Sequence, residues 1–261
     1  MLHARVAMPG RSDPVQVRSA RHGEPSMLGA ERVEVAPGAW LPPSNGLVYG
    51  VILNDRSSLD TYGERLHQPP HGKPPVAPVL YIKPYNTHTG HGSTVTLPPG
   101  ADSVEVGACL GIVFASSCAR LTAQSTLSNV AGYTIAIDLS LPKESLYRPP
   151  IIEKCFDGAC PLGPWMIDRA DISDPDALTI RTFINDRLVA TRSTGESLRS
   201  VSTLITDICE FMSFHPGDVL LTGYPLTAPR AKPGDRIAVE IDGLGRLECR
   251  IVRARGKGSP Q

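Results

Sequence analysis

Four side chains with catalytic or ion-binding chemistry lie within a stretch of 20 residues. Asp138 ends an apolar, strand-like run, and Arg148, Lys154 and Asp157 follow it in the sequence. A carboxylate can hold a metal ion or a proton, whereas guanidinium and ammonium groups bind carboxylates. The segment therefore predicts a site for a small anionic substrate, with Asp138 as the residue that would contact a metal ion.

The elements that must position these side chains are short strands separated by turns. Prolines (25) and glycines (24) are spread between short apolar runs, which favours strands and turns over long helices. Only residues 196–214 repeat apolar side chains at helical spacing, so one main helix is expected there, with a short one at 125–130. Strands of the main body are expected at 47–53, 79–83, 94–98, 108–114, 132–138, 165–168, 178–185, 188–191, 219–222, 236–241 and 245–252.

The chain is expected to divide into two parts of unequal size. Residues 1–45 predict a small N-terminal β appendage that ends in a proline-rich linker, and residues 46–256 predict a catalytic-type domain. The fold class is therefore β-rich α+β. Within the larger part, residues 54–78 are rich in proline, and a segment of this kind inside a compact domain is often a lid or a binding loop.

Composition limits the classes of function. Lys and Arg together number 26, as do Asp and Glu, so no basic surface points to nucleic acid or to a membrane. The sequence has no apolar window of transmembrane length and no signal-peptide core, which predicts a cytoplasmic protein. Its cysteines form no CxxC pair, and reduced, buried thiols are expected. They are Cys109, Cys118, Cys155, Cys160, Cys209 and Cys249.

A series of short motifs along residues 46–253 resembles the fumarylacetoacetate hydrolase family. No motif is specific alone, and their number and order carry the resemblance, which implies a mixed β-sandwich roll. The motifs are 131–134, Asp138, 154–157, 160–165, 174–175, Asn185, 216–218, 222–225, 233–235 and 243–245.

Three further segments, 53–60, 82–87 and 140–149, are similar to one branch of that family. This branch is the N-terminal half, or separate N-terminal subunit, of the isomerase/decarboxylases of 4-hydroxyphenylacetate (homoprotocatechuate) degradation. The resemblance implies decarboxylation of 5-oxopent-3-ene-1,2,5-tricarboxylate, isomerisation of 2-hydroxyhepta-2,4-diene-1,7-dioate, or both. It also implies a homodimer, or a heterodimer with a paralogous subunit of the C-terminal type.

The resemblance implies a divalent cation, Mg²⁺, Mn²⁺ or Ca²⁺, held by a Glu-x-Glu pair and a later aspartate. Gly107 and Cys109 stand where the two glutamates would be, and only Asp138 keeps its place. Glu105 has the same strand parity and is a candidate replacement. Since one aspartate does not hold Mg²⁺ without further ligands, a degenerate site with no metal or a weakly bound one is expected.

The lid of many family members carries a His and Glu acid/base pair, and the resemblance places Ser58 and Thr61 at or near those positions. Four nearby histidines are either solvated loop residues or alternative general bases, since imidazole titrates near neutral pH. They are His67, His71, His88 and His91.

The remaining candidates have substrate-binding roles. Lys154, Asp138 and Asp157 are the candidate catalytic residues, although Lys154 can instead be a structural partner of Asp157 and Asp138 a loop-edge carboxylate. Arg148 can bind a second carboxylate or form a surface ion pair. The other candidates for substrate contacts are Lys83, Tyr85, Tyr133, the backbone N–H groups of Thr222 and Gly223, and Tyr224, which replaces a small residue and narrows the pocket.

These observations leave three functional readings open. The first is an active decarboxylase or isomerase that binds a small 2-oxo carboxylate. The second is a weakly active or non-catalytic partner of a metal-bearing paralogue, suggested by the loss of the Glu-x-Glu pair. The third, an acylpyruvate hydrolase, is disfavoured because the missing metal ligands leave no evident way to activate water.

Overall fold

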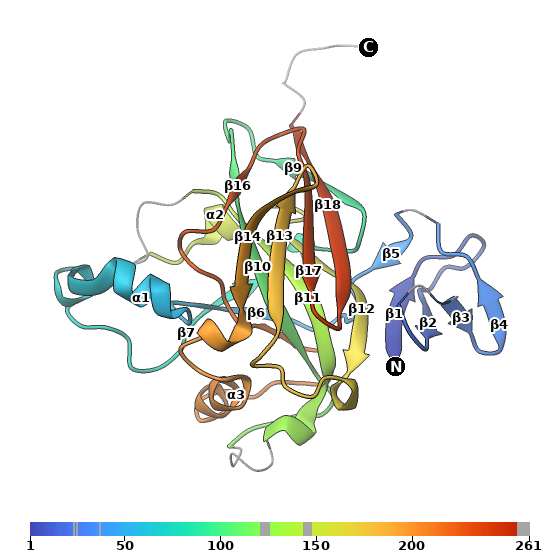
Figure 1. Ribbon diagram of the computed structural model, residues 1–261, viewed down its shortest axis with the longest axis horizontal. Helices are drawn as coiled ribbons and strands as arrows, with labels where there is room; N and C mark the ends of the chain where they lie inside the picture. The colour runs from blue at the N-terminus through green and yellow to red at the C-terminus, as the bar shows by residue number, and fades with distance from the viewer. Residues whose placement is uncertain (23, 25, 37, 121–125, 143–147, 255–261) are drawn as a thin grey trace.

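The computed structural model describes residues 1–22, 24, 26–36, 38–120, 126–142 and 148–254. Within these residues, two β-sheets make up most of the structure, one with thirteen strands and one with five. Figure 1 shows the two longest strands, β10 and β11, running through the centre of the main body. The structure is thus β-rich with mixed sheets, as the sequence predicts.

The larger sheet is mostly antiparallel. Its order is β4 (Glu31–Val33), β3 (Ser26–Leu28), β2 (Val15–Ser19), β1 (Leu2–Val6), β12 (Cys160–Asp168), β11 (Val130–Ser140), β10 (Val104–Phe114), β15 (Val219–Leu221), β6 (Val48–Ile52) and β7 (Val79–Lys83). Three short strands join its sides: β5 (Trp40–Leu41) on β1, β8 (His88–Thr89) on β12 and β16 (Arg230–Ala231) on β10.

The smaller sheet packs against the central strands of the larger one, with contacts from β13, β17 and β18 to β10 and β11. Its order is β14 (Arg187–Ser193), β13 (Thr179–Ile184), β17 (Arg236–Ile241), β18 (Gly245–Arg253) and β9 (Ser93–Leu97). Because β10 and β11 are covered on both faces, nearly every residue in them is buried. Such burial explains their continuous apolar runs, and it makes any charged residue within them exceptional.

The N-terminal strands β1–β4 lie to one side of the main body (Figure 1). They do not form a sheet of their own, because β1 pairs antiparallel with β12 and extends the larger sheet. Buried and exposed residues alternate along β2, as expected for a sheet with one covered face. The proposed boundary at residue 45 stays a prediction.

Helices are few among the described residues. They are α1 (Arg56–Tyr62), α2 (Ile151–Lys154) and α3 (Val201–Cys209), with 3₁₀ turns η1 (Gly63–His67), η2 (Tyr85–Thr87), η3 (Thr126–Asn129), η4 (Arg169–Asp171) and η5 (Thr194–Glu196). None of the helices in the described ranges is long and apolar enough to cross a membrane.

The expected helix at 196–214 is too long at both ends. The side chain of Ser200 caps the first turn of α3, and η5, with its own capping box at Ser193, precedes it. The expected helix at 125–130 is the 3₁₀ turn η3, and the proline-rich segment 54–78 contains α1 and η1. In each case a local capping hydrogen bond or a tight turn prevails over the apolar periodicity.

Candidate active site

Asp138 lies inside β11, opposite Gly107 of β10, and is fully buried. The strand continues to Ser140, so the alternative of a carboxylate at a loop edge is wrong. A carboxylate in the middle of a covered sheet is costly unless charged partners surround it. Charged side chains that compensate Asp138 must therefore lie around it.

Two lysines and a tyrosine surround this carboxylate. Lys83 Nζ, from the end of β7, lies 2.6 Å from Oδ1 of Asp138, and Lys154 Nζ, from the end of α2, lies 2.8 Å from Oδ2. The hydroxyl of Tyr81 donates to the same Oδ2. The strand β7, remote in sequence, and the nearby helix α2 thus meet at one buried carboxylate of β11.

Each lysine is held by further contacts. Lys83 Nζ donates to the carbonyl groups of Leu139 and Lys154, both at 2.8 Å, and to that of Ala159 at 3.1 Å. Lys154 Nζ donates to the hydroxyl of Tyr224 at 2.9 Å. It also lies 4.3 Å from the ring centroid of Tyr81 and 4.9 Å from that of Tyr224, so two aromatic faces stabilise its charge.

The electrostatics of this cluster follow from burial and from the two amines. Burial raises the pKa of Asp138, but Lys154 and Lys83 lower it by more, to about 2. Burial lowers the pKa of Lys83, an effect that Asp138 opposes. Burial and the charge of Asp138 raise the pKa of Tyr81 and Tyr224 well above their ordinary value. Both tyrosines are therefore neutral hydroxyls, and the formal charges of two lysines and one aspartate leave the cluster with one net positive charge.

The lowered pKa of Asp138 predicts an acid-dependent loss of stability. Its folded-state pKa of about 2 is below the ordinary 3.8, so the stabilisation is complete above pH 4 and lost as pH falls from there through 2. The expected contribution is about 2 kcal/mol. Urea unfolding of the wild-type protein between pH 6 and pH 2 would measure it, and a stability that does not change below pH 4 would contradict the prediction.

The candidate metal ligands do not fit a divalent cation. Gly107 offers no side chain, and burial raises the pKa of the Cys109 thiol, which keeps it protonated. Glu105 forms an ion pair with Arg230 at 3.2 Å. No group of three potential metal-binding side chains occurs in the described part of the chain. With the oxygens of Asp138 already engaged by amines, the donor set is one carboxylate where Mg²⁺ or Ca²⁺ requires several oxygens.

The space above Gly107 is filled by Tyr224. A Cβ added at residue 107 would overlap the Tyr224 ring and lie 2.7 Å from the backbone oxygen of Asp138. The glycine and the tyrosine are thus complementary, because the bulky ring fits only where the neighbouring strand has no side chain.

Substitution Gly107→Ala is expected to lower the free energy of unfolding by about 1–3 kcal/mol, through overpacking. In a Tyr224→Ala background the same substitution should cost less, though not nothing, because the contact with the Asp138 backbone remains. Chemical denaturation of the four proteins of this double-mutant cycle measures the coupling. Additive costs would show that the ring and residue 107 do not interact.

Several predicted residues lie away from this cluster. Asp157 is exposed and accepts a hydrogen bond from Asn86 at 2.8 Å, so the structural partner of Lys154 is Asp138 and the Asp157 alternative is wrong. Tyr85 is 62% exposed. Tyr133 is buried five residues before Asp138, on the opposite face of β11, and burial raises its pKa to about 12.

Arg148 lies at a cavity beside the cluster, whereas the 222–224 loop is held by contacts within the chain. Arg148 is exposed and lines a cavity of about 360 Å³ that Tyr81 also borders. The N–H of Thr222 donates to the carbonyl of Leu110 at 3.0 Å, so it is not available to a substrate carboxylate. Gly223 adopts a φ of +89°, which a glycine tolerates and which turns the chain so that Tyr224 reaches Lys154.

The four candidate histidines are spread around the neighbouring loops. Nε2 of His88 donates to the Lys83 carbonyl at 2.8 Å, and Nδ1 of His91 accepts from the N–H of Glu248 at 3.2 Å. Burial lowers the pKa of both rings. His67 is exposed at the end of η1, and His71 packs edge-on against Tyr62.

Sequence reasoning missed Tyr81 and Arg192. Tyr81 shares a strand face with Lys83, and that parity was a usable signal. Arg192 has no such signal. Its side chain is 10% exposed and donates to the carbonyls of Ala108 and Gly223 at 3.1 and 2.7 Å. It borders, with Tyr224, a cavity of about 230 Å³.

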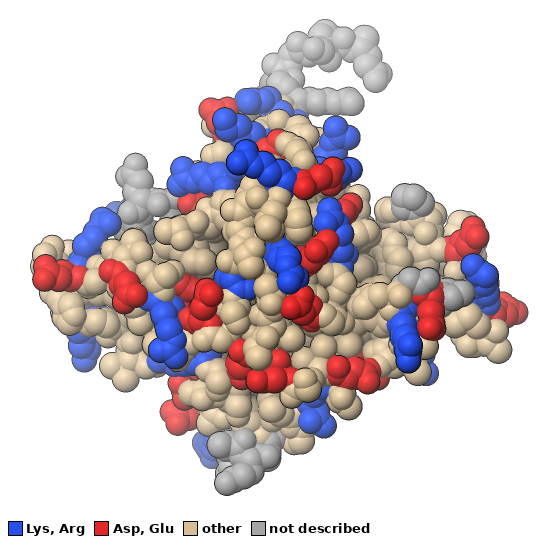
Figure 2. Space-filling model, in the orientation of Figure 1, with Lys and Arg blue, Asp and Glu red and all other residues tan. Residues whose placement is uncertain are grey.

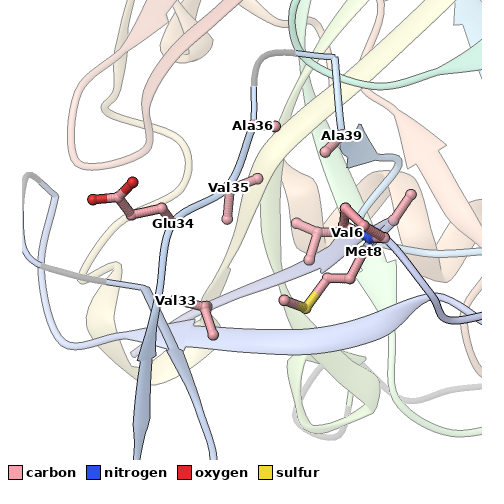
Figure 3. A pocket seen from close by; sticks show the side chains of 9 residues that line it. Val6, Met8, Val33, Glu34, Val35, Ala36 and Ala39 are labelled. Atoms are coloured by element: carbon pink, nitrogen blue, oxygen red, sulfur yellow. The ribbon is translucent and has the colours of Figure 1, made fainter.

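Another cavity, of about 430 Å³, lies in the N-terminal strands and has little chemistry. It is bordered by Val6, Met8, Val33, Val35 and other small apolar residues, and Glu34 points away from it (Figure 3). On the face of the molecule seen in Figure 2, Lys and Arg alternate with Asp and Glu without a large field of one sign. The Asp138 cluster is therefore the strongest candidate for chemistry.

Comparisons with known proteins agree with the motifs. A family model described as fumarylacetoacetate (FAA) hydrolase, C-terminal, matches residues 47–252. A 4-hydroxyphenylacetate degradation bifunctional isomerase/decarboxylase from Salmonella dublin is 40% identical over 207 residues, which are 79% of this chain and 47% of that relative. The chain thus spans about half the length of the curated relatives it matches.

Solved structures match almost the whole chain. A 5-carboxymethyl-2-hydroxymuconate delta-isomerase from Mycobacterium smegmatis superimposes with a TM-score of 0.79 at 26% identity, covering 98% of this chain and 100% of that one. A 2-hydroxyhepta-2,4-diene-1,7-dioate isomerase from Mycobacterium marinum gives 0.78 at 25% identity, covering 99% and 100%. The motif-based resemblance is confirmed, and the chain belongs to the fumarylacetoacetate hydrolase family.

Proposed function

We propose that this chain acts on unsaturated 2-oxo carboxylates of 4-hydroxyphenylacetate degradation, as a decarboxylase of 5-oxopent-3-ene-1,2,5-tricarboxylate. The observation that carries the proposal is the buried, net positive cluster of Asp138, Lys83 and Lys154. The names of its relatives supply the substrate class: bifunctional isomerase/decarboxylases, and isomerases among the solved structures.

Decarboxylation suits such a cluster because it needs a place for negative charge but no base. The bond between the leaving carboxylate and the carbon chain breaks, and its electron pair moves through the conjugated double bond to the 2-oxo oxygen. Carbon dioxide leaves, and the resulting dienolate takes a proton from solvent. The ammonium of Lys154 and the hydroxyl of Tyr224 would stabilise the developing negative charge, the kind of interaction that contributes most to such catalysis.

Isomerisation of the 2-hydroxy-diene to its 2-oxo-3-ene form requires a base that takes the proton of the 2-hydroxyl group and an acid that delivers a proton to the carbon at the far end of the diene. Asp138 is the carboxylate of the cluster, and with a pKa of about 2 it is a poor base near neutral pH. The tyrosine hydroxyls are neutral, as described above. The cluster therefore favours decarboxylation over isomerisation as the activity of this chain.

The two activities are separated by their products. Purified protein is mixed with the tricarboxylate, and release of carbon dioxide is followed together with the ultraviolet absorbance of the diene. Accumulation of the 2-hydroxy-diene supports decarboxylation, and a further change to the 2-oxo-3-ene form, with deuterium uptake in heavy water, would show isomerisation. No carbon dioxide with the chain alone or with a paralogous subunit would refute the decarboxylase proposal.

A second candidate function is a weakly active or non-catalytic partner of a paralogous subunit. Lys154 is 1% exposed, and its ammonium is already bound to Asp138 and Tyr224. A substrate oxygen would have to displace the Tyr224 hydroxyl to reach it. The chain also spans about half the length of its curated relatives. Catalysis by the isolated chain that falls on Lys154→Met would refute this second candidate.

A further inference from the structure

The Asp138 cluster is arranged differently from a metal site in which the carboxylate oxygens face an ion. Oδ2 of Asp138 accepts hydrogen bonds from both Lys154 and Tyr81, and Oδ1 lies 2.6 Å from the ammonium of Lys83. Oδ2 is thus held by two donors that belong to the chain, whereas Oδ1 accepts no hydrogen bond from the described residues and has the Lys83 ammonium beside it. A cation at Asp138 would have to displace a donor from Oδ2 or compete with the ammonium of Lys83 at Oδ1.

The space beside the carboxylate is filled as well. The ring of Tyr224 occupies the position where a side chain at Gly107 would lie, and its hydroxyl is 2.9 Å from Lys154 Nζ. The rings of Tyr81 and Tyr224 both lie within 5 Å of that ammonium. Two aromatic rings and an amine thus fill the volume that an ion with its water ligands would need.

The charge of the cluster also opposes the binding of a cation. Lys83 and Lys154 face Asp138 directly, so a divalent cation would enter a cluster that is already net positive. Arg192 is the next cation, near Cys109, and Asp55 is its nearest carboxylate at 3.8 Å. The Glu105 carboxylate is paired with Arg230, so it does not offset the excess.

We propose that this site excludes divalent cations. Tyr81 and Lys154 donate to Oδ2 of Asp138, and Tyr224 fills the space over Gly107 that an ion would take. The positive charge of the site is then part of the polypeptide and does not depend on the supply of an ion. The pair of Gly107 and Tyr224 maintains this arrangement, since the ring fits only against a glycine. This inference concerns ion binding and holds whether or not the chain turns over a substrate.

The experiment uses Mn²⁺ as a paramagnetic probe and the lysine ammonium groups as reporters. Nitrogen-15 spectra of the side-chain ammonium groups are recorded, and the signal of Lys154 is assigned from a Lys154→Arg variant. Mn²⁺ bound at Asp138 would lie within a few ångströms of Lys83 and Lys154 and would broaden both signals. In the wild-type protein both are expected to stay sharp up to about 1 mM Mn²⁺, the weak end of protein affinities for hard cations.

A triple variant tests whether the named residues cause the exclusion. Tyr81→Phe removes one of the two donors to Oδ2. Tyr224→Thr opens the space over Gly107, and Cys109→Glu adds a carboxylate on the face of β10 that Gly107 shares. This variant is expected to bind Mn²⁺, with loss of both signals, whereas Mg²⁺ should shift the signals without broadening them. Tyr85→Phe/Tyr49→Thr is the matched control for the two tyrosine substitutions, because both side chains lie outside the cluster.

Two outcomes would overturn the proposal. Broadening of the Lys83 and Lys154 signals in the wild-type protein would show that the site accepts a divalent cation as it stands. A folded triple variant that leaves both signals sharp would show that these residues are not what excludes the ion. If the triple variant fails to fold, the wild-type titration still decides whether the site accepts a divalent cation. The single Tyr81→Phe variant supports it, because its Lys83 and Lys154 signals are expected to stay sharp with Tyr224 in place.

Discussion

Substitution of Asp138 by asparagine is expected to lower the free energy of unfolding by about 3–5 kcal/mol, because it leaves two buried ammonium groups without their counter-ion. The geometry supports the upper part of this range. Lys83 and Lys154 are almost completely buried, and both reach the same carboxylate. Lys83 would keep its three carbonyl acceptors, but these carry only partial charge.

The measurement is urea unfolding of Asp138→Asn against the wild-type protein at neutral pH. Asp157→Asn is the matched control, because it makes the same chemical change at an exposed carboxylate with one hydrogen bond to Asn86. That control should change the free energy of unfolding by less than about 0.5 kcal/mol. Equal effects of the two substitutions would show that the cluster does not contribute as its geometry implies.

Replacement of Lys154 by methionine is expected to lower kcat for decarboxylation by about 10²–10³-fold, the usual cost of losing one preorganised group that stabilises negative charge. Methionine keeps much of the length of the side chain and removes the charge. Asp138 would retain Lys83 and Tyr81, so the loss of stability should be smaller than in Asp138→Asn. The variant therefore separates catalysis from folding better than a change at the carboxylate.

Steady-state kinetics with the tricarboxylate would give kcat and KM for Lys154→Met and for Lys232→Met. Lys232 is exposed near β16, so its substitution should leave both constants unchanged. A fall in kcat with little change in KM is expected if Lys154 acts mainly on the transition state. A kcat equal to that of the wild-type protein would mean that the electron pair is stabilised elsewhere.

The sequence by itself determined the family and the general architecture. Motifs such as 131–134 and 216–218 form a strand end and a turn. The residue preferences of such local structures can be recognised in the sequence without knowing the fold. Apolar runs located β10, β11 and β12, although each strand extends beyond the predicted range. The loss of the Glu-x-Glu pair at Gly107 and Cys109 was also visible, because it requires only alignment to motifs.

The tertiary structure alone decided which charges meet. Lys154 is close to Asp157 in sequence, yet its partner is Asp138, because α2 and the order of β7, β6, β15, β10 and β11 bring the amines to the middle of the sheet. Tyr224 reaches Lys154 across 70 residues of sequence. Strand parity gives the face on which a residue lies, but not which strands share that face. The complementarity of Gly107 and Tyr224 depends on such long-range packing. Only the folded structure therefore shows that the cations beside Asp138 are the ammonium groups of Lys83 and Lys154.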